Sequence, residues 1–165
     1  MKTSVQFQIA DKIELKRLLP ILFKIIHTNM EKIDPSGYSY EESKRIWCEC
    51  FYESVLTNNE LQVVLFYKGS DIVGFAAYSV KEQVFKLGEI QIKEEYQRTL
   101  IFYHFCKFMK SILPKDLMYI EGFANKSNLN SQSVMKSAGM VVVGTNKSGK
   151  SYHFKGDIRL LFEKY

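Results

Sequence analysis

The segment EEYQRTLIFYHFCKFM, residues 94–109, decides how we expect this chain of 165 residues to fold. It begins with polar residues and passes at once into an apolar pattern with helical spacing. The stretch before it, Val84–Ile92, alternates as strands do, because successive strand side chains point to opposite faces. A strand, a short polar turn and a helix are therefore predicted here. The apolar stripe predicted for this helix consists of Ile101, Phe102, Phe105, Phe108, Met109 and Ile112.

The start of this helix is also a functional signal. Backbone N–H groups in the first turn of a helix have no partner within it, and the helix dipole favours negative charge there. Arg98 adds a positive charge at the same point. We therefore predict that the turn binds an anion. The alternative is the ordinary start of a core helix.

Working outward, the length of 165 residues predicts a single domain over residues 1–165, and hydrophobic periodicity predicts its elements. Asp11, Ser39 and Asn128 are predicted to cap helices, and Gly139 to end one. Pro20 is expected to kink the first helix or to divide it in two. Strands are predicted at residues 4–10, 61–67, 72–80, Val84–Ile92, 118–124, 140–145 and 152–165. Helices are predicted at residues 12–30, 40–57, 101–112 and 128–138.

This order predicts an α/β (α+β) fold with a mixed, mostly antiparallel central sheet flanked by helices on both faces. A helix between two strands implies a parallel pair, whereas the hairpins imply antiparallel pairs. The buried face predicted for the second helix consists of Ile46, Trp47, Cys50, Phe51 and Val55. The apolar positions predicted for the last helix are Leu129, Val134, Met135 and Ala138.

Composition bounds the function classes. The formal net charge is +5, but the lysines are spread along the chain, so a solvated basic surface is expected rather than a nucleic-acid patch. No apolar run is long enough to span a membrane, and the N-terminus carries no signal-peptide pattern, which predicts a cytoplasmic protein. The three cysteines, Cys48, Cys50 and Cys106, have no metal-ligand spacing and are predicted to be buried free thiols.

Two other chemistries are poorly supported. Residues 144–151, GTNKSGKS, match the letters of a phosphate-binding P-loop, but the loop joins two predicted strands, whereas a P-loop leads into a helix. No serine or cysteine lies in a nucleophile-elbow pattern. The three histidines, His27, His104 and His153, lie in ordinary helix or strand patterns.

The helix opened by Asn128 and Ser131 and closed by Gly139 completes a second strand–helix–strand unit. Together with residues 87–112, it resembles the GNAT superfamily of N-acetyltransferases. The family's loop reads Gln or Arg, two residues, Gly, one residue, then Gly or Ala, and Gln97 retains its first position. Asn128, Ser131 and Gly139 match the family's later motif in register.

This resemblance implies an N-acetyltransferase that uses acetyl-CoA as co-substrate and acetylates a primary amine by direct attack. Glu89 is the candidate general base and Glu121 the second candidate, since a partly buried carboxylate suits that role. Residues 12–57 would form the acceptor side, with Tyr38, Tyr40 and Trp47 as lining residues. The coenzyme-binding residues implied by the resemblance are Ile90, Gln91, Ile92, Gln97, Arg98, Thr99, Leu100, Ile101, Phe102, Asn128 and Ser131.

The sequence departs from the family pattern at three places. Leu100 and Phe102 replace the loop glycines, and Met135 stands where the family often has a general-acid tyrosine. These departures favour an alternative function, a catalytically inactive GNAT-fold binding or regulatory module. A homodimer is also a possibility, through pairing of an exposed edge of the final predicted strand.

Overall fold

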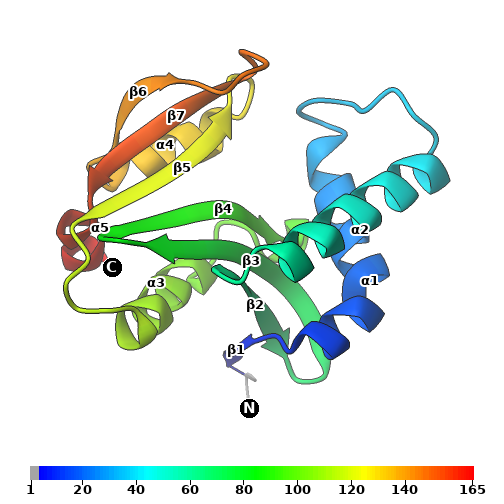
Figure 1. Cartoon of the computed structure of the whole chain (residues 1–165), viewed down its shortest axis with the longest axis horizontal. Coiled ribbons are helices and arrows are strands. Elements are labelled where there is room, and N and C mark those ends of the chain that lie inside the picture. The colour runs from blue at the N-terminus through cyan, green and yellow to red at the C-terminus, as the bar shows by residue number, and fades with distance from the viewer. Residues whose placement is uncertain (1–3) are drawn as a thin grey trace. The chain divides into compact units, whose positions relative to one another are not determined.

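The computed structural model describes residues 4–165, which form seven strands, five α-helices and one short 3₁₀ helix. The strands form one sheet in the order β1-β2-β3-β4-β5-β7-β6 (Figure 1). β4 and β5 are parallel, whereas β1–β2, β5–β7 and β6–β7 are antiparallel. The predicted fold class, a mixed and mostly antiparallel sheet with flanking helices, is confirmed.

The chain divides into two compact units, each built from two segments. Of the described residues, the first unit holds 4–77 and Glu89–Arg98, and the second holds Tyr78–Gly88 and Thr99–Tyr165. Elements of the first unit are β1 (Val5–Ile9), α1 (Lys12–Met30), α2 (Tyr40–Thr57), β2 (Leu61–Lys68) and the 3₁₀ helix Glu94–Tyr96. Elements of the second are α3 (Ile101–Ile112), β5 (Tyr119–Asn125), α4 (Leu129–Ser137), β6 (Val141–Thr145), β7 (Ser151–Asp157) and α5 (Ile158–Lys164). Strands β3 (Asp71–Lys81) and β4 (Val84–Ile92) contribute to both units. The single-domain organisation stays a prediction.

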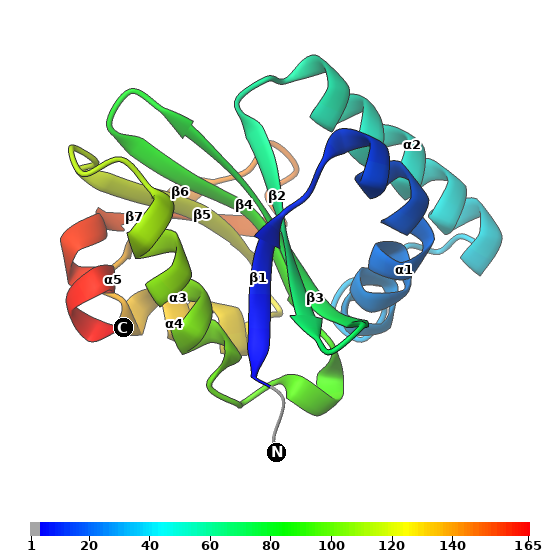
Figure 2. The same ribbon diagram turned by 90° about the horizontal axis from the view of Figure 1, so that it is seen from below.

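In the first unit, α1 and α2 lie against each other, and β1 pairs with β2 (Figures 1 and 2). One apolar cluster joins Leu22 of α1, Val55 of α2 and Phe75 of β3, all nearly inaccessible to solvent. α1 runs without a break through Pro20, so the division into two helices is wrong. Although Pro20 removes a backbone hydrogen bond, apolar residues on both sides of it are buried against the same core, which keeps the helix whole.

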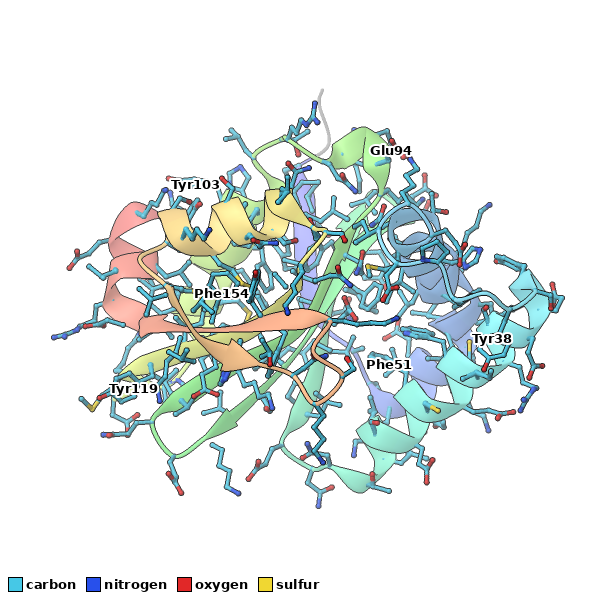
Figure 3. The ribbon with its side chains drawn as sticks, turned by 90° about the horizontal axis from the view of Figure 1, so that it is seen from above. Tyr38, Phe51, Glu94, Tyr103, Tyr119 and Phe154 are labelled. Carbon is cyan, nitrogen blue, oxygen red and sulfur yellow. The ribbon has the colours of Figure 1, made fainter. Side chains whose placement is uncertain are left out.

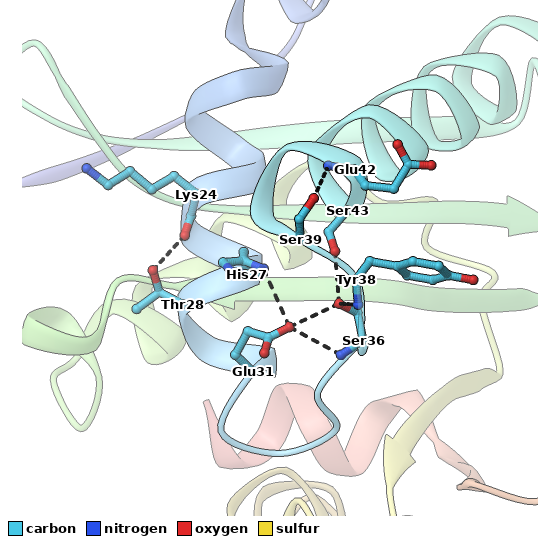
Figure 4. Close-up of polar contacts among 9 residues, drawn as sticks. All are labelled: Lys24, His27, Thr28, Glu31, Ser36, Tyr38, Ser39, Glu42 and Ser43. Atoms are coloured by element: carbon cyan, nitrogen blue, oxygen red, sulfur yellow. Dashed lines mark hydrogen bonds and ion pairs between the residues drawn. The ribbon is translucent and has the colours of Figure 1, made fainter.

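Hydrogen bonds within the chain stabilise the connection between α1 and α2 (Figure 4). The Ser39 hydroxyl accepts the N–H of Glu42 at 3.3 Å, which confirms the predicted cap. Ser36 donates to Glu31 Oε1 through both its N–H and its hydroxyl, each at 3.2 Å, and its Oγ lies 2.8 Å from Ser43 Oγ. These bonds join the end of α1 to the first turn of α2.

The cysteine prediction is only partly right. Cys106 is buried in α3, and burial raises the pKa of its thiol to about 12. Cys48 is half-buried against the core of the first unit, whereas Cys50 is exposed. The prediction that Cys50 lies on the buried face of α2 is wrong, because that face is rotated toward Cys48.

In the second unit, α3 connects the parallel strands β4 and β5, as predicted. Its stripe is shifted from the predicted one: Ile112 is exposed, whereas Cys106 and Leu113 are buried. α4 also buries fewer of its apolar residues than predicted, because Leu129 and Val134 are exposed. The packing surface of α4 is therefore small.

The end of the chain differs most from expectation. The predicted strand at residues 152–165 is right only as far as Asp157, because α5 follows. The Asp157 carboxylate accepts the N–H of Arg159 at 2.9 Å and caps this helix, while Ile158 and Leu161, three residues apart, are buried. Consecutive apolar residues at 160–162 hid this change of period in the sequence.

The pairing of β7 bears on two of the predictions. β7 pairs with β5 on one side and with β6 on the other, so the proposed dimer through its exposed edge is wrong, and dimerisation itself stays a prediction. The P-loop-like residues form a hairpin between β6 and β7, with Gly149 in the left-handed region (φ 72°). No helix follows this loop directly, which confirms that it is not a P-loop.

Gly139 ends α4 as predicted and has a φ of 81°, which L side chains rarely adopt. A Cβ atom at this position would lie 2.8 Å from Leu160 Cδ1 of α5. We expect Gly139→Ala to lower the free energy of unfolding by about 1–3 kcal/mol, from backbone strain and this clash. Urea denaturation would measure it. The control is Gly144→Ala, which meets open space without a positive φ and is expected to change stability by less than about 0.5 kcal/mol. Equal effects of the two variants would contradict the role of Gly139.

Candidate functional site

The predicted anion site lies where the chain enters α3. The helices α1, α2, α4 and α5 are each capped by an Asp, Ser or Asn side chain, whereas Leu100, at the cap position of α3, makes no such bond. The N–H of Ile101 makes one long contact, 3.4 Å, to the Thr99 hydroxyl. The first turn of α3 therefore presents backbone N–H groups and the positive end of the helix dipole.

The backbone explains how this turn forms without glycine. Leu100 has a φ of −77°, and Phe102 lies within α3, so neither position needs the left-handed conformation that glycine favours. The positive φ falls on Arg98 instead, at 61°. The Leu100 side chain is exposed, whereas the ring of Phe102 packs edge-on against Tyr165 at 5.2 Å between centroids. The packing of Phe102 within the second unit thus explains why an aromatic residue occupies this position.

The candidate base Glu89 lies in the second half of β4, within the first unit. The amide of Gln91 donates to Glu89 Oε1 at 2.7 Å. Burial raises the pKa of Glu89 above its ordinary value near 4.5, although this bond and one from the N–H of Ile90 partly oppose the change. A carboxyl group with a raised pKa is better suited to accept a proton than an exposed one.

The second candidate, Glu121, lies in a different environment on β5 of the second unit. Its Oε1 is 3.3 Å from Lys155 Nζ, and its Oε2 is 3.4 Å from His153 Nε2. The His153 ring stacks on Phe123 with 4.6 Å between centroids. Glu121 is thus paired with the charged Lys155 of β7, whereas the hydrogen-bond partners of Glu89 are amides.

Two side chains form hydrogen bonds to the last residue of β4. The carbonyl oxygen of Ile92 accepts hydrogen bonds from Asn29 Nδ2 at 3.0 Å and from Gln97 Nε2 at 2.9 Å. Both lone pairs of this oxygen are then used. A coenzyme that pairs with residues 90–92, as predicted, would have to use other backbone groups.

Asn128 and Ser131 cooperate in the second unit. Asn128 Oδ1 accepts the N–H of Ser131 at 3.0 Å, so Asn128 caps α4 as predicted. A coenzyme contact by Asn128 would therefore fall to its side-chain NH₂ group. Of the eleven residues implied by the resemblance, Ile90 to Ile92, Gln97 and Arg98 lie in the first unit and the other six in the second. Their joint use by one ligand stays a prediction.

A cavity of about 670 Å³ lies in the first unit, lined by α1, the start of α2 and residues 93–95. Three lysines, Lys24, Lys44 and Lys93, line it together with Tyr40 and Asn29. Of the other predicted acceptor-side residues, Tyr38 is exposed, as Figure 3 shows, and Trp47 stacks on Phe51 with 4.6 Å between centroids. Tyr40 is thus the member of that set that reaches the cavity.

Sequence reasoning missed two amide side chains. Asn29 lies in line with Leu22 and Ile26 on the buried stripe of α1, where a polar residue needs hydrogen-bond partners. That position was a signal that could have been read. Gln132 of α4 is buried, and its amide donates to the carbonyls of Asn125 and Lys126 at 3.1 and 2.9 Å. Nothing in its spacing revealed this role.

Residues 4–165 lack the features of two other classes of site. The helices there do not have the length and apolar character that crossing a bilayer requires. Nor do these residues bring three or more His, Cys, Asp or Glu side chains together in an arrangement that could hold a metal ion.

No family model matches the sequence, and no curated protein matches it either. Solved structures do match the fold. An acetyltransferase from Thermus thermophilus has a TM-score of 0.74 at 12% identity, covering 95% of this chain and 99% of that one. PaiA N-acetyltransferase from Thermoplasma acidophilum, in complex with coenzyme A, has 0.68 at 17%, covering 93% and 99%. An aminoglycoside acetyltransferase in complex with coenzyme A and kanamycin has 0.68 at 13%, covering 98% of both chains.

These structures show that the chain has the GNAT acetyltransferase fold, as the sequence resemblance predicted. At such identities the likeness concerns the fold alone. Activity and substrate must be argued from the site.

The raised pKa of Glu89 makes stability depend on pH. A carboxyl group whose pKa is higher in the folded state stabilises the fold below its unfolded value, near 4.5, and this contribution is lost as pH rises through the folded pKa. We therefore expect the stability of Glu89→Gln, relative to wild type, to increase as pH rises through that window. Denaturation curves between about pH 4 and 8 would measure the difference.

Glu94 provides a control of opposite sign. Its hydrogen bond to Lys32, with 2.7 Å between Nζ and Oε2, lowers the pKa of this exposed carboxylate. Its stabilisation is present above the unfolded pKa and is lost as pH falls. Glu94→Gln should therefore lose stability relative to wild type as pH rises. A Glu89→Gln difference that stays constant with pH would contradict burial of the carboxylate.

Proposed function

We propose that this chain, which has the GNAT acetyltransferase fold, is an acetyl-CoA-dependent N-acetyltransferase that acts on a primary amine of a small molecule or peptide. The observation that carries this proposal is the start of α3. It follows β4, has no side-chain cap, and is preceded by the positive side chain of Arg98. Such a helix start suits a diphosphate, which coenzyme A carries. The predicted cytoplasmic location belongs to the same proposal.

Coenzyme binding would use both backbone and side chains. The amides from Arg98 to Phe102 would hold the diphosphate, with the Arg98 guanidinium adding charge–charge attraction. The backbone of Ile90 and Gln91 would pair with the pantetheine arm, and the NH₂ group of Asn128 would donate to it. Two of the solved structures that share the fold, the PaiA and aminoglycoside enzymes, are complexes with coenzyme A, which supports coenzyme binding by this chain.

When bound, acetyl-CoA supplies an acetyl thioester that an amine can attack. The amine must be neutral to act as a nucleophile, so a base has to remove a proton from it. Glu89 would take this proton, directly or through water, while the acetyl–nitrogen bond forms and the acetyl carbon–sulfur bond breaks. Coenzyme A would leave as a thiolate and take a proton from solvent. The raised pKa of Glu89 is closer to neutral pH than that of an ordinary glutamate, which supports this role.

The cavity between α1 and residues 93–95 is the candidate acceptor pocket. Its lining combines the apolar side chains of Ile21 and Ile25 with both signs of charge: three lysines, Lys24, Lys44 and Lys93, and two glutamates, Glu94 and Glu95. An acceptor with an apolar part and groups of both charges, such as an amine that also carries a carboxylate or phosphate, would complement this lining. A substrate screen would start with amines of this class.

The second candidate function is a GNAT-fold module without transfer activity, which binds a ligand or partner. It is favoured by the exposed Leu100 side chain at the start of α3 and by the occupied carbonyl of Ile92. The Leu100 side chain takes up space beside the proposed diphosphate site, and the bonded carbonyl of Ile92 is one acceptor fewer for the pantetheine arm. Binding measurements test the coenzyme site, and the activity assay distinguishes the two functions.

We expect acetyl-CoA to bind the purified protein and Arg98→Glu to weaken binding about tenfold or more, because the substitution reverses a charge beside the diphosphate. Isothermal titration calorimetry at low salt would measure both affinities. Lys115→Glu makes the same change in net charge beyond the opposite end of α3 and should change the affinity little. If millimolar acetyl-CoA does not bind, the coenzyme proposal fails.

Measuring the activity of variants would show which of the two candidate residues is the base. Once an acceptor is found, we expect Glu89→Gln to lower kcat/KM about 100-fold, a typical loss for a general base. Glu121→Gln should have a much smaller effect. A thiol-release assay would follow the reaction. If Glu121→Gln causes the larger loss, the role of base passes to Glu121, and if neither variant loses activity, neither residue is the base.

A further inference from the structure

Three amide side chains of the first unit form a chain of hydrogen bonds that ends on Glu89. Gln97 Nε2 donates to Asn29 Oδ1 at 3.1 Å, and Asn29 Nδ2 donates to Gln91 Oε1 at 2.8 Å. Gln91 Nε2 then donates to Glu89 Oε1 at 2.7 Å. The chain thus joins three places: the residue before Arg98, the end of α1 and the second half of β4.

All three bonds point in the same direction. An ionised carboxylate can only accept, so the nitrogen of Gln91 must face Glu89, and its oxygen then needs a donor. Asn29 supplies that donor through its nitrogen, and its own oxygen is bonded in turn by Gln97. Rotating any one amide by about 180° would place oxygen against oxygen or nitrogen against nitrogen. The orientation that Gln91 takes toward Glu89 is therefore reinforced by Asn29 and Gln97, two residues that do not bond Glu89.

Burial makes this orientation energetically important. Gln91 is only 8% exposed, so water is poorly placed to replace a lost partner. A buried polar group without a partner costs more than an exposed one. Asn29 and Gln97 are also held by their shared acceptor, the carbonyl oxygen of Ile92. Each of these two amides thus donates to a backbone carbonyl as well as taking part in the chain of hydrogen bonds.

We propose that Asn29 and Gln91 are positioning residues for Glu89, and that Gln97 determines their orientation from the segment that leads into α3. The role of Glu89 as a base rests on the proposed function, whereas the hydrogen-bond chain does not. The chain of hydrogen bonds connects Glu89 with Gln97, which precedes Arg98 in the segment where the coenzyme is proposed to bind. The acidity of Glu89 would then respond to the conformation of that segment.

The surroundings of Glu89 make its titration a clean readout. The influences on its pKa are burial, the Gln91 side chain and the N–H of Ile90, and no charged side chain among the described residues contributes. Removing the Gln91 donor should therefore raise the pKa further. Removing Asn29 should act in the same direction but less strongly, because Gln91 can then rotate and accept a hydrogen bond from the protonated carboxyl group, which favours the neutral form of Glu89.

The experiment is a carboxyl NMR titration of apo protein labelled with ¹³C at the glutamate side chains, with the Glu89 signal identified from its loss in Glu89→Gln. We expect Asn29→Leu to raise the pKa of Glu89 by about half a pH unit, and Gln91→Leu to raise it more. Gln97→Leu should cause a smaller rise. The adjacent Thr28→Val, which removes a hydroxyl bonded at 2.8 Å to the Lys24 carbonyl, should leave the titration unchanged.

A double variant separates the chain of bonds from general loosening of the structure. If Asn29 acts through Gln91, adding Asn29→Leu to Gln91→Leu should cause no further change in the pKa of Glu89. An equal rise in both backgrounds would overturn the proposal, as would an unchanged titration in Asn29→Leu. Asn29→Ala gives the same comparison if leucine prevents folding, with Ile92→Val as a packing control. No coenzyme is needed, so this result is independent of the binding and activity tests.

Discussion

The short parallel pairing between β4 and β5 is the constraint on which the second unit depends. Val84 to Leu87 pair with Tyr119 to Gly122, and parallel neighbours must be joined by a crossover. α3 is that crossover, and it begins at Ile101, after β4 ends at Ile92 and the 3₁₀ helix Glu94–Tyr96 has followed. Gly122 has no side chain, which allows Met135 of α4 to approach to within 3.1 Å of where a Cβ would lie. The pairing thus determines where two helices meet the sheet.

In the first unit, hydrogen bonds between side chains provide partners for the polar residues of β4. The second half of β4 carries Glu89 and Gln91, which would be costly to bury without partners. α1 supplies one partner through Asn29, and the turn after β4 supplies another through Gln97. Buried polar networks of this kind favour one arrangement over others of similar packing, because every member depends on its neighbour's orientation.

The fold and the site support the transferase proposal to different degrees. Structures at 12 to 17% identity share the architecture, and the architecture alone hosts many chemistries. The specific support is electrostatic: an uncapped helix start, a neighbouring Arg98 and a carboxyl group whose pKa burial raises. The missing glycines weigh less than the sequence suggested, because the backbone at Leu100 does not need positive φ.

Local signals in the sequence were sufficient for most of the elements. Asp11, Ser39 and Asn128 cap helices as predicted, and Gly139 ends one, because a cap involves residues only about two to four positions apart. The alternation of β4 and the crossover α3 were likewise readable. α5 was missed because three consecutive apolar residues fit a strand as well as a helix, and its packing decided between them.

What only the tertiary structure decided are the contacts between distant residues. Asn29 and Gln91 are 62 positions apart, and no periodicity links them. The choice of Cys48 rather than Cys50 for the core likewise depended on how α2 is rotated against the sheet. The sequence by itself determined the strands and helices other than α5, and the residue types at the candidate site. The partners of Glu89 depended on folding, because a hydrogen bond between two amides forms only where packing brings them within about 3 Å.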